Sequence, residues 1–235
     1  MDTNGTVKYV KDVARAATDL FIHQAEHAIQ ERGEFHVILS GGSTPLAMYK
    51  LLVQEAANAI FWQHTNIFWG DERFVPHDHA DSNYGAAKQA LLDHVPIPPN
   101  HVHPMPYLQD DPKAAVQGYH LTLTQVLGNT PMADLTFLGL GDDAHTASLF
   151  PQTGAVHAGG LVTVVETEAK GTRLSLTAST LSHSRTVAFL VAGDNKRDAL
   201  NNTLNAPKNI DTYPAQAIKA RESLLWLTDI EFDAN

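Results

Sequence analysis

The feature that most constrains the fold is the alternation of short apolar runs with longer segments of helical periodicity. The apolar, β-prone runs lie at 35–39, 67–69, 101–105, 135–138, 162–165, 172–177, 187–191 and 224–227. Strands that alternate with helices form mostly parallel sheets, because each crossover helix returns the chain to the same end of the sheet. The sequence therefore predicts an α/β fold in which helices cover both faces of a mostly parallel sheet.

Helical patterns lie between these runs, at 8–32, 46–56, 82–92, 111–127 and 194–204. Gly33 is suited to the C-cap of the first segment, and Thr44 to the N-cap of the second, with Pro45 in its first turn. Ser82 and Asp194 are suited to cap the third and the fifth segment. These signals agree with the apolar periodicity, so a helix is expected in each segment.

Composition limits the functional classes that are open to the chain. Sixteen Lys and Arg residues against 26 Asp and Glu residues give a net charge of −10, which argues against a nucleic-acid partner. The absence of cysteine excludes disulfides, thiolate metal sites and a cysteine nucleophile. No apolar run approaches the roughly 18 residues that span a bilayer, and residues 1–12 lack a signal-peptide core. We therefore expect a cytoplasmic protein without a membrane partner.

Nothing along the chain marks a boundary between domains. The sequence contains no low-complexity linker and no internal repeat, and the proline-rich stretch at 96–106 has the character of a loop. Residues 1–235 are therefore predicted to form a single domain. The sequence leaves open whether this domain is a monomer or a homodimer.

A glycine-rich turn, SGGSTP at 40–45, joins a predicted strand to a predicted helix. Gly41 and Gly42 expose backbone N–H groups at the positive end of the helix, and Ser43 and Thr44 add hydroxyl donors. This arrangement suits a phosphate group, but it also suits a tight turn that does no more than start a helix. The Gly-Lys-Ser/Thr sequence of a P-loop is absent.

Cationic residues follow three other strands. Arg73 comes after the strand at 67–69, Lys196 follows the strand at 187–191, and Arg173 lies in the strand at 172–177. Any of these cations alone is compatible with a solvated surface, and Arg73 has Asp71 and Glu72 as local partners. Several cations and amides at strand ends together predict a pocket for an anion such as phosphate or carboxylate.

The Asp143-x-His145 sequence follows the glycine-rich end of the strand at 135–138, and a helix-compatible segment comes next. Histidine is the usual general base near neutral pH, and a carboxylate two residues away can orient its ring. Aspartate also forms turns, so a purely structural role for Asp142 and Asp143 is the alternative. Ligands bind beyond the carboxyl ends of strands in open α/β sheets, which favours a catalytic His145.

Three segments together resemble the 6-phosphogluconolactonases. They are LSGGSTPLAMYKLL, FWGDERFVPHDHADSNYGAAKQALL and DLTFLGLGDDAHTASLFP, and GTRLSLTASTL, VAFLVAGDNKRDAL, YPAQAI and LLWLTD follow in the order of that family. The resemblance implies a three-layer α/β fold with a Rossmann-like sheet. It also implies hydrolysis of 6-phospho-D-glucono-1,5-lactone, a small phosphorylated sugar lactone, without a metal or an organic cofactor.

The resemblance also implies roles for individual residues. His145 matches the general base of the family, and Asp143 matches the acidic residue beside it. The substrate-binding loop corresponds to Gly41, Gly42, Ser43 and Thr44. The basic residues that hold the phosphate or carboxylate end correspond to Arg73, Arg173 and Lys196. These matches predict that His145 takes a proton from the water that attacks the lactone carbonyl.

One position departs from the family pattern, in which glycine separates the acidic residue from the histidine. Here that position is Ala144. If its φ angle is positive, alanine is strained there by roughly 1 kcal/mol or more, whereas at negative φ it is harmless.

Two other functions remain open at this stage. One is that of a glucosamine-6-phosphate deaminase/isomerase-type sugar-phosphate enzyme, since the GGSTP turn is shared with that wider superfamily. The HTASLFP segment distinguishes the chain from those deaminases. The other is that of a non-catalytic regulator that binds a sugar phosphate. The intact Asp143 and His145 argue against loss of catalysis.

Overall fold

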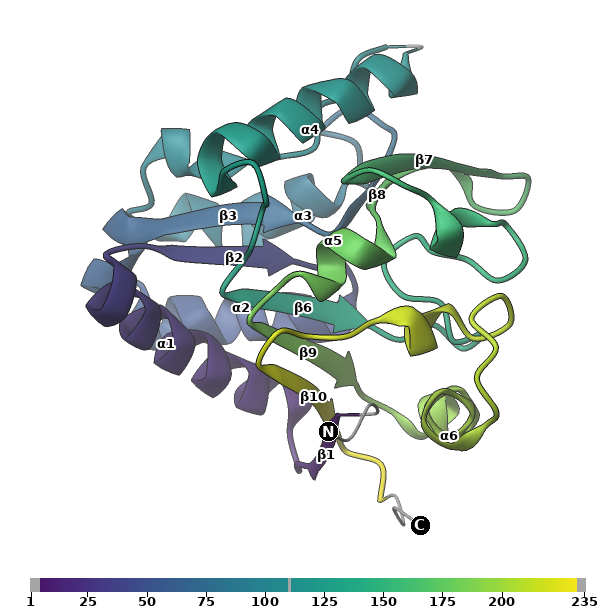
Figure 1. Ribbon diagram of the computed structural model, residues 1–235. Coiled ribbons are helices and arrows are strands. Elements are labelled where there is room, and N and C mark those ends of the chain that lie inside the picture. The colour runs from purple at the N-terminus through teal and green to yellow at the C-terminus, as the bar shows by residue number, and fades with distance from the viewer. Residues whose placement is uncertain (1–4, 110, 232–235) are drawn as a thin grey trace.

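A parallel sheet forms the centre of the structure, a computed structural model that describes residues 5–109 and 111–231 (Figure 1). Within these residues its seven strands have the order β1-β10-β9-β6-β2-β3-β5. They are β1 (Thr6–Tyr9), β2 (Phe35–Leu39), β3 (Thr65–Trp69), β5 (Val102–His103), β6 (Leu135–Gly139), β9 (Thr186–Val191) and β10 (Ser223–Thr228). Every residue of β3 and of β9 is buried, which explains the continuous apolar runs that mark these strands.

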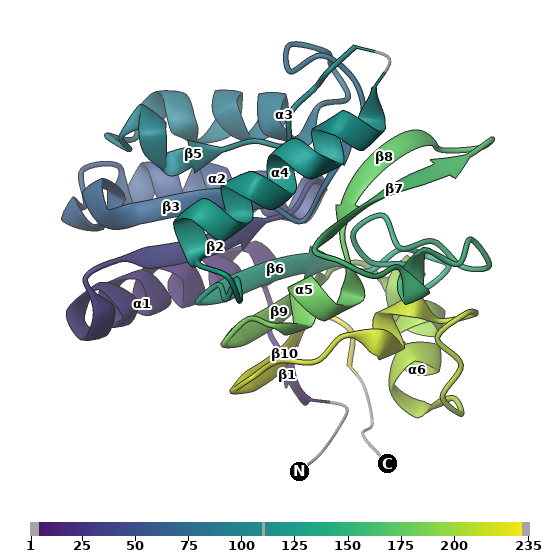
Figure 2. The same ribbon diagram turned by 45° about the horizontal axis from the view of Figure 1, so that its top comes forward.

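Helices lie on both faces of this sheet. Figures 1 and 2 show α1 (Val13–Arg32) and α2 (Ser43–Ala56) over one face, and α4 (Pro112–Leu127) and α5 (Ala178–Ser182) over the other. The remaining helices are α3 (Asn83–Ala90) and α6 (Arg197–Asn205), with the 3-10 turns η1 (Ile60–His64), η2 (Leu92–His94), η3 (Pro99–His101), η4 (Ala155–His157), η5 (Asp194–Lys196) and η6 (Pro214–Ala217). The predicted three-layer, Rossmann-like α/β fold is confirmed. No helix of the described residues is long and apolar enough to cross a membrane.

A second, antiparallel sheet extends from the carboxyl end of β3. Its strands are β4 (Asp71–Arg73), β7 (Val162–Thr167) and β8 (Gly171–Leu176), in the order β4-β8-β7. The runs predicted at 162–165 and 172–177 are thus strands, but they form this hairpin rather than part of the parallel sheet (Figure 2). Because only one residue separates β4 from β3, the small sheet begins at the carboxyl end of β3 in the large sheet.

The order of the strands places a crevice between β2 and β6. From β2 the chain proceeds to β3 and β5 on one side, whereas β6, β9 and β10 lie on the other side. β2 and β6 are neighbours through the pairs Val37 with Leu135 and Ile38 with Thr136. The connections that leave their carboxyl ends diverge to opposite sides, and such a topological switch point is where open α/β sheets bind ligands.

The N-terminal prediction needs correction. The helix predicted at 8–32 begins at Val13, and Thr6–Tyr9 instead forms an edge strand that pairs with β10. Asp12 is the N-cap of this helix, because its carboxylate accepts a hydrogen bond from the Arg15 N–H at 2.9 Å. The helix therefore does not extend toward the N-terminus to residue 8. The pairing partner of the edge strand lies more than 200 residues away, so only the tertiary structure selects the strand.

Two other helix starts differ from the prediction, and two caps are confirmed. α2 starts at Ser43 with Gly42 as its N-cap, so Thr44 lies inside the helix. Asp194 begins the 3-10 turn η5, and α6 starts only at Arg197. Gly33 ends α1 with a left-handed φ of 84°, and Ser82 caps α3 by accepting from the Gly85 N–H.

Candidate functional site

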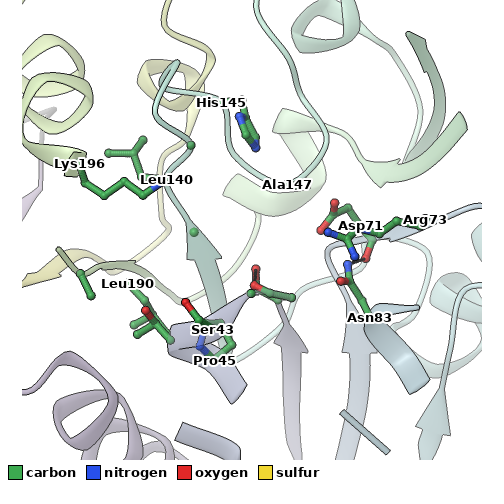
Figure 3. A pocket seen from close by; sticks show the side chains of 17 residues that line it. Ser43, Pro45, Asp71, Arg73, Asn83, Leu140, His145, Ala147, Leu190 and Lys196 are labelled. Carbon is green, nitrogen blue, oxygen red and sulfur yellow. Dashed lines mark hydrogen bonds between the residues drawn. The ribbon is translucent and has the colours of Figure 1, made fainter. Parts of the chain in front are cut away.

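A cavity of about 280 Å³ opens at the carboxyl ends of β2, β6 and β9 (Figure 3). It lies at the switch point between β2 and β6, and β4 and α3 close its other side. Its lining consists of Ser40, Gly41, Gly42, Ser43, Thr44, Pro45, Asp71, Arg73, Asn83, Gly139, Leu140, Gly141, His145, Ala147, Leu190, Ala192 and Lys196. Segments far apart in the sequence therefore contribute to one pocket.

The glycine-rich turn forms one wall of this pocket. Gly42 has φ 107° and ψ 171°, and no side chain caps the helix α2 that starts after it. The first helical hydrogen bond is donated by Leu46 to the Gly42 carbonyl, so the N–H groups of Ser43 and Thr44 remain available. Gly41 permits close packing, because a Cβ there would lie 2.0 Å from Asn83 Oδ1. A free helix N-terminus that lines a pocket suits an anion.

Arg73 and Arg173 lie opposite each other on the neighbouring strands β4 and β8. Arg73 donates to the Asp81 carbonyl at 2.6 Å, while the Arg173 side chain has no hydrogen bond or ion pair among the described residues. Burial and the neighbouring Arg73 charge lower the pKa of Arg173. Arg173 does not line the cavity itself, but it is the cross-strand partner of Arg73, which does. Neither Arg73 nor Arg173 forms an ion pair with a carboxylate among the described residues, so a bound anion would compensate their positive charge.

The local carboxylates do not neutralise Arg73, contrary to the alternative in which it pairs with Asp71 or Glu72. Glu72 is 3% exposed and accepts from the N–H groups of Arg73, Asn83 and Tyr84 and from the Ser82 hydroxyl. Burial raises the pKa of Glu72 against these hydrogen bonds. Its carboxylate thus holds the start of α3 in place.

Lys196 reaches the pocket from η5, on the side opposite Arg73 (Figure 3). Its Nζ donates to Asp142 Oδ1 at 2.6 Å, and Asn195 Nδ2 donates to the same oxygen at 3.1 Å. The hydrogen bond from Lys196 lowers the pKa of Asp142. Asp142 thus links the loop after β6 to the loop after β9, and holds the ammonium group at the edge of the cavity.

His145 points into the pocket (Figure 3), and its ring contacts the carboxylate of Asp143. The imidazole Nδ1 lies 2.5 Å from Asp143 Oδ1, and that oxygen also accepts from the His145 N–H at 3.1 Å. Burial acts to raise the pKa of Asp143, but the hydrogen bonds and the charge of His145 outweigh it and lower this pKa. With Nδ1 engaged by the carboxylate, Nε2 is the ring atom that is free to act on a ligand.

The loop that carries His145 is a sequence of turns, so the helix-compatible interpretation of this segment is wrong. Ala144 has φ 61° and Ala147 has φ 48°, both in the left-handed region. The Ala144 N–H donates to the Gly141 carbonyl, and the Gly141 N–H donates to the His145 carbonyl. A Cβ on Gly141 would lie 2.0 Å from His145 Nδ1, so only glycine lets the turn close over the imidazole. Ala144 therefore has the positive φ angle at which alanine is strained.

Sequence reasoning missed several pocket residues, of which Asp71 and Asn83 are the most polar. Asn83 follows the N-cap Ser82, and its Nδ2 donates to the Asp71 carbonyl at 3.0 Å. The sequence offered no signal for Asn83 beyond its position directly after the N-cap Ser82. His77, in the loop that follows Arg73, is partly buried and its Nε2 lies 2.8 Å from the Met105 carbonyl. Within the described residues, no group of three or more His, Asp or Glu side chains is arranged to hold a metal ion.

The pocket combines an oriented imidazole with the cationic side chains of Arg73 and Lys196 and with free backbone N–H groups. An imidazole with a free Nε2 can take a proton from water. The cations and the amides can bind one anionic group and stabilise a second charge that develops during a reaction. This set of groups is suited to general-base hydrolysis of a small anionic substrate.

Comparison with known proteins gives consistent matches. Residues 9–226 match the family described as glucosamine-6-phosphate isomerases/6-phosphogluconolactonase. A 6-phosphogluconolactonase of Synechocystis sp. is 42% identical over 212 residues, which cover 88% of this chain and 87% of that protein. One of Nostoc sp. is 38% identical, over 90% of this chain and 88% of the relative. The structure of 6-phosphogluconolactonase from Trypanosoma cruzi superimposes with a TM-score of 0.84 at 26% identity, over 97% of this chain and 95% of that one.

Proposed function

Because the chain belongs to the glucosamine-6-phosphate isomerase/6-phosphogluconolactonase family, we propose that it hydrolyses 6-phospho-D-glucono-1,5-lactone to 6-phosphogluconate. This is the second step of the oxidative pentose phosphate pathway. The observation that carries the proposal is the orientation of His145 by Asp143 at the wall of a pocket that also contains Arg73 and Lys196. A general base and a binding site for an anionic substrate are the two things that this hydrolysis requires.

The 6-phosphate is bound between β4, β8 and the start of α2 in this proposal. Arg73 and Arg173 supply positive charge that no carboxylate of the described residues neutralises through a hydrogen bond or an ion pair. The N–H groups and hydroxyls of Ser43 and Thr44 supply further donors at the positive end of a 14-residue helix. Lys196 lies on the other side of the pocket, where it can bind the lactone or the carboxylate of the product.

The reaction then needs one base and one site for negative charge. His145 Nε2 takes a proton from water, and the resulting hydroxide attacks the lactone carbonyl. Asp143 stabilises the imidazolium that forms. Backbone N–H groups of the pocket lining that do not bind the phosphate stabilise the oxyanion of the tetrahedral intermediate. The imidazolium returns the proton to the ring oxygen as the C–O bond breaks, so that the histidine is neutral again and no covalent intermediate is required.

The decisive experiment is a lactonase assay on freshly generated 6-phosphogluconolactone, corrected for its spontaneous hydrolysis. We expect turnover well above the spontaneous rate, and no release of ammonia from glucosamine 6-phosphate. Ammonia release without lactone hydrolysis would identify an amino-sugar phosphate deaminase instead. Binding of 6-phosphogluconate without either activity would identify a non-catalytic regulator.

A further inference from the structure

Besides the contact of Asp142 with Lys196, the loop that carries His145 makes two further attachments to the rest of the molecule. Toward the C-terminal segment, the Ala144 carbonyl accepts from the Ala215 N–H at 3.1 Å. Toward the small sheet, the Ser148 hydroxyl donates to Asp71 Oδ2 at 2.6 Å. The second attachment spans 77 positions of sequence and joins the loop of the base to the strand of Arg73.

This second attachment is buried and reinforced. Ser148 is 1% exposed, and its N–H also donates to the hydroxyl of Ser175, which is fully buried. Ser175 lies on β8 directly opposite Asp71 of β4. Ser148 is therefore fixed to both of the strands that carry the arginines, β4 with Arg73 and β8 with Arg173.

The loop depends on such contacts because it has no regular structure of its own. Ala144 and Ala147 lie on either side of the base with left-handed φ angles, and such strain persists only where the surroundings enforce it. His145 and the arginines lie in different segments, so no single helix or strand fixes the distance between them. The hydrogen bond from Ser148 to Asp71 connects the loop of His145 directly to the strand of Arg73.

We propose that Asp71 and Ser148 are positioning residues for the hydrolysis, and that their hydrogen bond sets the place of the general base relative to the phosphate-binding arginines. This inference rests on the proposed function. A substrate that is held by its phosphate presents its carbonyl at a fixed distance from the arginines, so the base must be held at a matching distance. Loss of the connection should slow the chemical step and leave the binding of the phosphate intact.

Three variants separate this role from a general loss of stability. Ser148→Ala removes the donor and keeps the carboxylate, whereas Asp71→Asn keeps an oxygen that can accept from Ser148 and removes the charge. Ser184→Ala is the matched control, because Ser184 is also fully buried and its hydroxyl lies 2.7 Å from Thr136 Oγ1, at the opposite end of β6. The measurements are kcat and KM on 6-phosphogluconolactone, with the melting temperature of each variant.

We expect Ser148→Ala to lower kcat about tenfold or more, since a misplacement of about 1 Å costs up to ~10²-fold in rate. Its KM should remain within about threefold, because the arginines are untouched. Asp71→Asn should lower kcat less than Ser148→Ala does, because its amide oxygen can still accept from Ser148, and its KM should be unchanged or lower because a negative charge beside the arginines is removed. Ser184→Ala should lose stability but not kcat.

Several results would overturn the positioning role. They are a wild-type kcat in Ser148→Ala, an equal loss of kcat in Ser148→Ala and Ser184→Ala, and a loss in Asp71→Asn as large as that in Ser148→Ala. Each of these comparisons requires a wild-type protein that hydrolyses the lactone, so none of them contradicts the proposed function. A wild-type protein without lactonase activity overturns the proposed function and this inference together.

Discussion

Single residues in the loop after β6 determine the geometry of His145, the proposed base. Ala144 is 1% exposed, has φ 61° and lies between the carboxylate and the imidazole that contact each other. The left-handed conformation reverses the chain, so that Asp143 Oδ1 reaches both the backbone and the ring of His145. A buried methyl group in this conformation is a compromise, because its burial stabilises the fold while its φ angle costs about 1 kcal/mol.

This compromise predicts an unusual tolerance of glycine at position 144. In Ala144→Gly, relief of about 1 kcal/mol of strain offsets the loss of about 0.8 kcal/mol of methyl burial. The free energy of unfolding should therefore stay within about 1 kcal/mol of the wild type. Ala17→Gly is the control, since Ala17 is fully buried within α1. It should cost about 2 kcal/mol, from helix propensity and burial together. Equal losses in denaturant titrations would show that Ala144 is not strained.

Removal of the imidazole tests the base directly. We expect His145→Ala to lower kcat by roughly 10² to 10⁴-fold, the usual contribution of a general base. His157→Ala is a matched control, because His157 Nε2 also contacts a carboxylate, that of Asp211 at 2.8 Å, but does not line the pocket. Steady-state turnover of both folded variants is the measurement. A His145→Ala protein with near-normal kcat would contradict the assignment.

At the scale of elements, the strand pair β4–β8 determines where positive charge gathers. The register places Arg73 opposite Arg173, and like charges that face each other across a ladder destabilise it. Burial lowers the pKa of Arg173, and the Arg73 charge adds to the effect. The strand pair therefore carries a charge arrangement that is unfavourable for the empty fold and favourable for a bound phosphate.

This conflict predicts opposite effects of one substitution on binding and on stability. Arg173→Gln should raise KM by about tenfold, because it removes a positive charge beside the phosphate site, while its melting temperature stays equal or rises. Arg185→Gln is the control, because Arg185 is also partly buried but has Asp134 and Glu222 as partners far from the pocket. It should lose stability without a change in KM. A lower melting temperature with unchanged KM for Arg173→Gln would refute the argument.

The edge strand β5 of the seven-stranded sheet makes the stability of the protein sensitive to acid. Burial lowers the pKa of His103 on β5 to about 4 from its ordinary 6.5, with smaller effects of His101 and His36. Between these values the unfolded chain binds a proton that the folded chain does not, so stability rises with pH and falls as pH drops from 6.5 to 4. In His103→Gln the fall in melting temperature over this window should be smaller. His27→Gln, at an exposed position of α1, should keep the wild-type slope.

At the scale of the whole molecule, the two sheets share one hydrophobic core cluster. β4 follows β3 directly, and the small sheet contributes Val162, Val165, Leu174 and Leu176 to the hydrophobic core cluster that contains the central strands. We propose that residues 1–235 form a single domain, since a continuous core gives no place at which two parts could separate.

Cooperative unfolding tests this proposal. Far-UV circular dichroism reports the helices, while fluorescence reports Trp62, Trp69 and Trp226, which are all at most 2% exposed. We expect both signals to change in one transition with the same midpoint. Addition of 6-phosphogluconate should shift that transition to higher denaturant without dividing it, because the ligand binds the folded state only. Two separate midpoints would mean that the small sheet unfolds independently.

The pattern of the sequence predicted most of the elements because local signals and tertiary packing agree in them. The strands β2, β6 and β9 are buried on both faces, so their apolar runs are visible without a structure. β1 was missed because its residues alternate little and its pairing with β10 is decided by distant sequence. The antiparallel hairpin β7–β8 was found as two strands, but nothing local distinguished it from the parallel sheet.

The sequence by itself determined the layer architecture and the chemical groups of the candidate site, His145, Asp143, the glycine-rich turn and the three cations. These follow from periodicity and from motifs at strand ends, which are local properties. The tertiary structure alone decided how the groups are related. It showed that Ala144 is left-handed, that Arg173 is unpaired among the described residues, and that Ser148 binds Asp71 across 77 positions. Conformational strain and the desolvation of charge depend on what surrounds a residue, and contacts between distant segments determine that environment.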